Sequence, residues 1–154
     1  MIFAVVFWLQ KTPEKEITLY FAGPDAMGLV PEVRSVIIVN DKFSTILEEL
    51  IAGPKDPELY KTIPEETKVL QVIQKDQTLT VNFSKELRDN HWGGSTGEIL
   101  TVYSIVNSLT EIPTVENVQF WIEGEQIETL VGHIDLRNPL AKNTSIILTE
   151  TQAD

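Results

Sequence analysis

The segment with the clearest capacity for chemistry is the loop at residues 93–97, which contains three glycines, a serine and a threonine. An apolar pattern typical of a helix follows the loop directly. Loops of this composition bind anions at helix N-termini, through free backbone N–H groups and the helix dipole. One interpretation is therefore a ligand-binding site for an anion such as a cell-wall fragment. Its residues would be His91 and the loop from Gly93 to Gly97, which includes Gly94 and Ser95.

The same loop also has the features of an ordinary helix start. Glu98 follows Ser95 at the spacing of a capping box, in which the two side chains satisfy the first backbone N–H groups of the helix. The loop also lacks the lysine that a phosphate-binding P-loop carries. We therefore expect the helix start to be satisfied by its own residues, and no cofactor to bind there.

A second candidate site pairs His133 with Asp135. Residues at i and i+2 of a strand lie on one face, so both side chains could reach one metal ion. A zinc site needs a third protein ligand, and the chain has only one other histidine, His91. We expect a hydrogen-bonded pair at a strand end and no metal, with a metal-dependent hydrolase as a weaker alternative.

The other polar residues assemble no catalytic group. There is no cysteine and no G-x-S-x-G motif, which excludes the commonest arrangements of a nucleophile. Glu48 and Glu49 are adjacent on a predicted helix and point in different directions, which favours a solvated face. Arg34 is expected to pair with Asp25 or Glu32 and to fix the loop between the first two strands. These patterns indicate a protein that is not an enzyme.

Trp92 and Trp121 are candidates for protein contact. Trp92 lies in a polar loop, and Trp121 lies in a predicted strand. Exposed aromatic residues are enriched in interfaces and contribute strongly to binding. The alternative is that each ring covers one end of the core.

Seven segments have the alternation or the β-branched composition of strands. The one from Val33 to Val39 is apolar at nearly every position after Ser35, so we expect it to be buried on both faces. The seven predicted strands are Ile17 to Phe21, Val33 to Val39, Val69 to Ile73, Thr78 to Phe83, Val118 to Ile122, Glu128 to Val131, and Ser145 to Leu148.

Two segments have helical spacing. Residues Lys42 to Ala52 follow an Asn-Asp cap and end at Gly53-Pro54, and residues Thr96 to Glu111 carry the second apolar stripe. The order of elements predicts an α+β fold with a mixed, largely antiparallel sheet and two long helices packed on one face.

The composition and net charge of the chain disfavour some classes of binding partner. The chain has 154 residues, 42% hydrophobic and 23% charged, with a net charge of -11. This composition is typical of a globular domain, and the acidic balance disfavours nucleic acid and anionic lipid. Met1 to Leu9 is apolar and is interpreted as a packed strand, the remnant of a membrane anchor or a short signal segment. We divide the chain into this segment with its polar linker at 1–16, a domain at 17–150 and a tail at 151–154.

Taken together, several short motifs resemble the GerMN domain of sporulation and spore-germination proteins and of some bacterial lipoproteins. They are Tyr20-Phe21, Leu29, Pro31-Glu32, Arg34, Gly53-Pro54, Ile63-Pro64, Thr67, Val81-Asn82-Phe83-Ser84, Gly94-Ser95, Glu98, Ile105-Val106-Asn107-Ser108-Leu109, Gly124, Thr129-Leu130, Gly132-His133, Asp135 and Pro139. Asn82 and Ser108 depart from the aspartate and threonine that are common in the family.

The resemblance implies a non-enzymatic, extracytoplasmic domain, usually tethered to a membrane. We therefore predict a protein-interaction or scaffold domain linked to sporulation or spore germination. Its partners would be proteins of a cell-envelope or forespore assembly, or further copies of itself. The membrane would be reached only through an N-terminal anchor. We expect the contact surface to include Trp92, Trp121 and the loop from His91 to Ser95.

Overall fold

The computed structural model describes residues 12–149, so the interpretations of Met1 to Leu9 lie outside the described residues. None of the helices within this range has the length and apolar character needed to cross a membrane. The elements, in chain order, are β1 (Glu14–Ala22), the 3-10 turn η1 (Pro24–Ala26), β2 (Leu29–Ile37), α1 (Lys42–Ala52), β3 (Val69–Lys75), β4 (Thr78–Phe83), α2 (Glu86–Asp89), α3 (Ser95–Leu109), β5 (Asn117–Ile122), β6 (Glu125–Gln126), β7 (Leu140–Ala141) and η2 (Thr144–Ile146).

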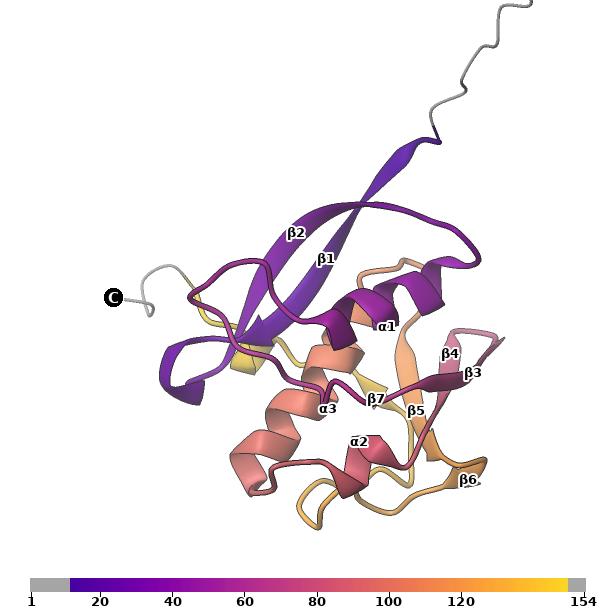
Figure 1. The fold of residues 1–154 in the computed structure, drawn as a ribbon. Helices are drawn as coiled ribbons and strands as arrows, with labels where there is room; N and C mark the ends of the chain where they lie inside the picture. Colours follow the sequence, from indigo (N-terminus) through magenta and orange to yellow (C-terminus); the bar gives the residue numbers. More distant parts are fainter. Residues whose placement is uncertain (1–11, 150–154) are drawn as a thin grey trace, which may run out of the picture.

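The strands form two sheets (Figure 1). β1 and β2 form an antiparallel hairpin, and β3, β4, β5 and β6 form the larger sheet, in which β7 also pairs with β5. Within it β4 and β5 are parallel, because the chain between them crosses back through α2 and α3. The predicted α+β class with a mixed, mostly antiparallel arrangement is confirmed, but the strands are divided between two sheets and do not form one.

Helix α1 has the bounds that the sequence predicts. The Asp41 side chain caps it by accepting a hydrogen bond from the Ser44 N–H at 2.8 Å. Gly53 ends it with a φ of 94°, a conformation that favours glycine. The apolar face buries Ile46 and Leu47 in the core.

Helix α3 lies at the centre of the domain and contacts both β1 and β5 (Figure 1). Its apolar stripe packs in the main core cluster with aromatic residues from both sheets, among them Phe21 and Phe120. Five of its polar side chains, all from Glu98 onward, are buried as well and bond to backbone groups. The Ser108 hydroxyl accepts from the Tyr20 N–H at 3.0 Å, and the Asn107 amide bonds to both backbone groups of Asn143. These polar residues connect α3 to its surroundings and do not form a solvated face.

The prediction that β2 is buried on both faces is wrong. Arg34 and Val36 are buried, while Val33 is 65% exposed and Ile37 48% exposed. Alternate residues of a strand point to opposite faces, and in this region only the inner face of the β1–β2 hairpin packs against the body of the domain. The apolar run in the sequence therefore reflects an uncovered outer face.

Two predicted strands near the C-terminus are also absent. Residues from Glu128 to Val131 form a loop, and the segment from Ser145 to Leu148 contains the turn η2 and a single bridge at Ile147. Leu130 is buried from the loop, so an apolar side chain here does not require a strand. The two-residue strand β7 was not predicted.

Candidate functional site

The loop before α3 is held in a conformation that requires glycine. Gly93 and Gly94 have φ values of 80° and 82°, in the left-handed region. The chain thus reverses sharply after α2 and enters α3 at Ser95, which is exposed. Gly94 occupies the cap position, and α3 has no hydrogen bond from a capping side chain.

His91 is fixed by two hydrogen bonds that define its protonation. Its Nδ1 accepts from the Gly93 N–H at 2.9 Å, so Nε2 carries the proton and donates to the Thr101 hydroxyl at 2.9 Å. Burial lowers the pKa of His91, and the nearby Glu98 carboxylate opposes this effect. Through these two hydrogen bonds, the neutral imidazole holds the loop before α3 against the helix.

Trp92 packs against the imidazole ring of His91. Its ring stacks on the His91 ring with 5.0 Å between centroids and an angle of 20° between planes. Gly97 leaves room for the indole, because a Cβ at that position would lie 3.1 Å from the indole Nε1. The ring is therefore positioned by the loop while remaining 56% exposed.

An apolar pocket of about 270 Å³ lies beside Trp92. Ala22, Ala26 and Leu100 contribute aliphatic walls, and Tyr60 forms an aromatic edge that is 59% exposed. Tyr60 reaches this place because its backbone forms a bridge with Ala22 at the end of β1. We call this feature, with Trp92, Tyr60 and the residues that line it, the aromatic pocket. The sequence carried no signal for Tyr60, because the bridge joins segments far apart in the chain.

The predicted capping box is wrong. Glu98 is fully buried, and its carboxylate accepts hydrogen bonds from the backbone N–H groups of Leu130, Val131 and His133 at 2.8, 3.0 and 2.7 Å. The side chain faces away from the start of α3 and holds the loop that follows β6. A carboxylate satisfied by three backbone donors is a stable buried arrangement.

The predicted pairing of His133 with Asp135 is also wrong. Both residues lie in the loop after β6, not in a strand, and Asp135 forms a bidentate ion pair with Arg137. This pair lowers the pKa of Asp135 to about 2. Among residues 12–149, no group of three acidic or histidine side chains is placed to bind a metal ion.

Trp121 lies elsewhere in the molecule. It is half-buried on the outer face of the larger sheet, where its neighbour across the strand is Asn82. Together with Ile73 and Thr80 it lines a shallow pocket of about 210 Å³. The structure therefore joins His91, Trp92 and Gly93 in one site and leaves Trp121 outside it.

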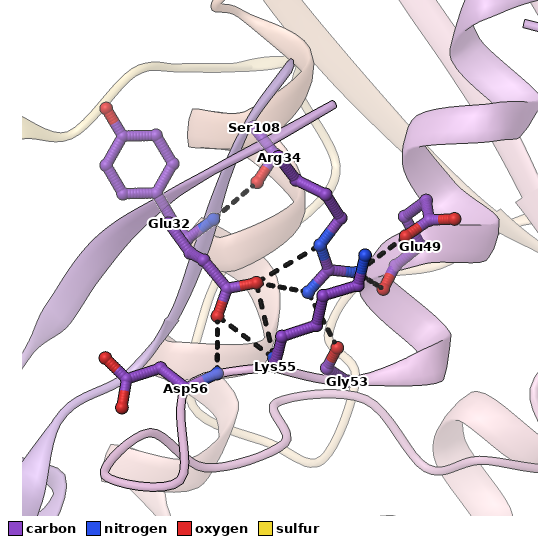
Figure 2. Close-up of polar contacts among 8 residues, drawn as sticks. Glu32, Arg34, Glu49, Gly53, Lys55, Asp56 and Ser108 are labelled. Carbon is purple, nitrogen blue, oxygen red and sulfur yellow. Dashed lines mark hydrogen bonds and ion pairs between the residues drawn. The ribbon is translucent and has the colours of Figure 1, made fainter. Parts of the chain in front are cut away.

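A buried arginine, Arg34, connects β2 to the C-terminal end of α1 (Figure 2). Arg34 is 4% exposed and forms ion pairs with Glu32 and Glu49, the latter at 2.6 Å. It also donates to the Gly53 carbonyl at 3.1 Å. Arg34 was expected to fix the loop between the first two strands, but it fixes the C-terminal end of α1 to β2.

Glu32 extends this cluster to the chain that leaves α1. Its carboxylate accepts from the backbone N–H groups of Lys55 and Asp56, each at 3.0 Å (Figure 2). Burial raises the pKa of Glu32, but the hydrogen bonds from Arg34 and the two amides outweigh it and lower the pKa below its ordinary value. The residues that we call the Arg34 cluster are Glu32, Arg34, Glu49, Gly53, Lys55 and Asp56.

The family comparison gives this arrangement a context. A profile described as "Germane: Sporulation and spore germination" matches residues 18–128, which include β1 from Thr18 onward, the Arg34 cluster, the loop before α3 and β5. The chain belongs to the Germane family. No curated protein matches it significantly.

Three solved structures share the fold of this Germane domain. A candidate lipoprotein of Clostridium perfringens has a TM-score of 0.60 and 25% identity over 84% of this chain and 88% of that one. The first GerMN domain of the Bacillus subtilis sporulation protein GerM has a TM-score of 0.66 and 20% identity, over 82% of this chain and 97% of that one. The tandem GerMN domains of the same protein give 0.69 and 21%, over 86% of this chain and 46% of that one.

Proposed function

We propose that this Germane domain is a non-enzymatic protein-interaction module that works outside the cytoplasmic membrane in sporulation or spore germination. The description of the family supports the process, and the likeness to a candidate lipoprotein supports the location. The partners would be proteins of an envelope or forespore assembly. A membrane tether would lie N-terminal to β1.

The observation that carries this proposal is the aromatic pocket. Trp92 and Tyr60 are large side chains that are more than half exposed, and they flank an apolar hollow that is large enough for one or two side chains. Aromatic residues beside a small apolar pocket are typical centres of binding energy in protein interfaces. The polar groups beside the pocket support this role, because the His91 ring is engaged in holding Trp92 and its loop.

The test replaces Trp92 with serine and measures binding of envelope proteins from sporulating cells by pull-down and cross-linking. We expect the Trp92→Ser variant to fold normally and to lose a partner that the unchanged protein retains. Trp121→Ser is the matched comparison, since it alters a tryptophan on a different surface. Binding that survives Trp92→Ser, or survives both substitutions, would refute the role of the pocket.

A second candidate function is the binding of an anion, such as a cell-wall fragment, at the start of α3. One observation favours it: Glu98 bonds to the loop after β6, and Gly94, the residue at the cap position, supplies no side-chain hydrogen bond to the first turn of α3. A ligand that binds only the native protein raises its melting temperature. Titration with inorganic phosphate and with soluble peptidoglycan fragments therefore tests this function, and an unchanged melting temperature with all of them would eliminate it.

A further inference from the structure

The outer edge of β2 is open for strand pairing. β2 pairs with β1 along its whole length, from Glu14 opposite Ile37 to Ala22 opposite Leu29. On its other edge, the described part of the chain supplies only one bridge, between Leu29 and Ile147. From Val33 to Ile37 the backbone on this edge has no strand partner among residues 12–149. Such an edge is a template for an added strand.

The side chains beside this edge fit an extended partner. Val33, Ile37 and Val39 are 65%, 48% and 80% exposed. An open groove of about 570 Å³ runs along the strand and is lined by residues 32–35 and by Lys55 and Asp56. We call Val33 to Ile37, with this groove, the β2 edge.

The charges beside the β2 edge identify the partner. Glu14 and Glu16 are exposed on β1, paired with Ile37 and Ser35, and therefore lie on the same face as the exposed apolar residues. Within the groove Glu32 is already neutralised by Arg34. The groove also contains the exposed Lys55 and Asp56, whose formal charges cancel. The surface thus offers an apolar row bordered by the two carboxylates of β1, in a chain with a net charge of -11.

We propose that the β2 edge binds an extended segment of a positively charged partner protein as a third strand of the β1–β2 sheet. Apolar residues of that segment pack on Val33 and Ile37, and its lysine or arginine residues face Glu14 and Glu16. Main-chain hydrogen bonds give such a complex its affinity, and alternate side chains give it specificity. A second copy of this chain is a poorer occupant, because two strongly acidic surfaces repel one another.

The β2 edge shares no lining residue with the aromatic pocket. The inference therefore extends the proposed function to a second surface, and each can fail alone.

The experiment titrates the full chain with a short synthetic peptide of repeating Val-Thr-Lys-Thr, in which valine and lysine share one face of the extended strand, and follows amide hydrogen exchange. We expect the peptide to protect those amides of residues 33–37 that face the free edge, since the others already face β1, and to bind less tightly as salt rises. A peptide with glutamate in place of lysine, and a lysine peptide with N-methylated backbone amides, are the matched controls. Both should bind at least about tenfold more weakly, through charge repulsion and through loss of main-chain donors respectively.

Variants of the protein complete the test. Ile37→Thr should weaken binding of the lysine peptide severalfold, whereas Ile73→Thr should not, although Ile73 is equally exposed at 50% on the other sheet. The double change of Glu14 and Glu16 to glutamine should remove most of the salt dependence. Equal binding of the acidic peptide, or protection elsewhere, would overturn the proposal. So would protection, in the free protein, of those amides of residues 33–37 that face the free edge and do not bond to β1. Such protection would assign the edge to a second copy if it rises with protein concentration and to Met1–Leu9 if it does not.

Discussion

The Arg34 cluster and the aromatic pocket are both built on the connection between α1 and β3, yet they use their side chains in opposite ways. In the cluster, the charged groups are engaged with one another and with backbone amides (Figure 2). In the pocket, two aromatic rings keep more than half of their surface exposed. The buried charges of the cluster therefore serve internal structure, whereas the exposed rings of the pocket are those to which the proposed function assigns partner contact.

The substitution Arg34→Ala is expected to cause the largest loss of stability, and it tests whether the Arg34 cluster has an internal role. The substitution leaves Glu32 and Glu49 without their cation and the Gly53 carbonyl without its donor, so it should lower the free energy of unfolding by about 3 kcal/mol. Denaturant-induced unfolding measures the loss. Arg137→Ala is the control, because its ion pair with Asp135 is exposed to solvent and should contribute far less to the free energy of unfolding. Equal losses in the two variants would contradict an internal role for the cluster.

The next largest effect is expected from Glu98→Gln. Glutamine keeps one acceptor oxygen but presents an amide to N–H groups that need acceptors, so the stability should fall by about 2 kcal/mol. Hydrogen exchange should accelerate at the amides of Leu130, Val131 and His133 in particular. Exposed Glu125→Gln should change neither quantity. Unchanged exchange in the loop after β6 would show that Glu98 does not hold it.

A smaller effect is expected from the titration of Glu32. Its pKa in the folded protein lies below the ordinary value of 4.5, so the folded state binds fewer protons than the unfolded state. The carboxylate therefore stabilises the fold above pH 4.5, and this contribution is lost as the pH falls through the lowered pKa. Glu32→Gln should remove this component, which is measured as the difference between the two stability profiles at acidic pH. Parallel profiles would refute it.

The smallest effect on stability is expected from Trp92→Ser. The ring is more than half exposed, so its removal should lower the free energy of unfolding by about 1 kcal/mol or less while abolishing partner binding. Thermal unfolding and pull-down on the same preparation separate the two quantities. A loss as large as that of Arg34→Ala would mean that Trp92 is part of the core, and the contrast between the two regions would disappear.

The sequence predicts those elements whose signals are local. The bounds of α1 follow from Asp41, Gly53 and the apolar spacing between them, all within one short segment. The alternation in β4 likewise matches its burial. The sequence correctly predicts that the small-residue loop precedes a helix. The prediction that a capping box satisfies the first backbone N–H groups of that helix is wrong.

What the sequence could not show depends on contacts between distant segments. Glu98 has the spacing of a local cap, but three amides more than thirty residues away offer a buried carboxylate better geometry. The outer face of β2 has the apolar composition of a buried strand, because composition does not reveal whether another layer of the protein covers that face. Tyr60 joins the aromatic pocket only through its bridge to Ala22. Such placements require the tertiary structure.

The parallel pairing of β4 and β5 has a consequence for the making of the protein. A ribosome delivers the β3–β4 hairpin before the residues of α2, α3 and β5, so for that interval one edge of β4 lacks its neighbour. Nascent chains with unpaired strand edges are prone to aggregate, and long-range parallel pairing is slow. The need for a chaperone during translation, or for export before folding, would therefore depend on how long the edge of β4 waits for β5. The hairpins, whose strands are adjacent in the chain, would contribute less.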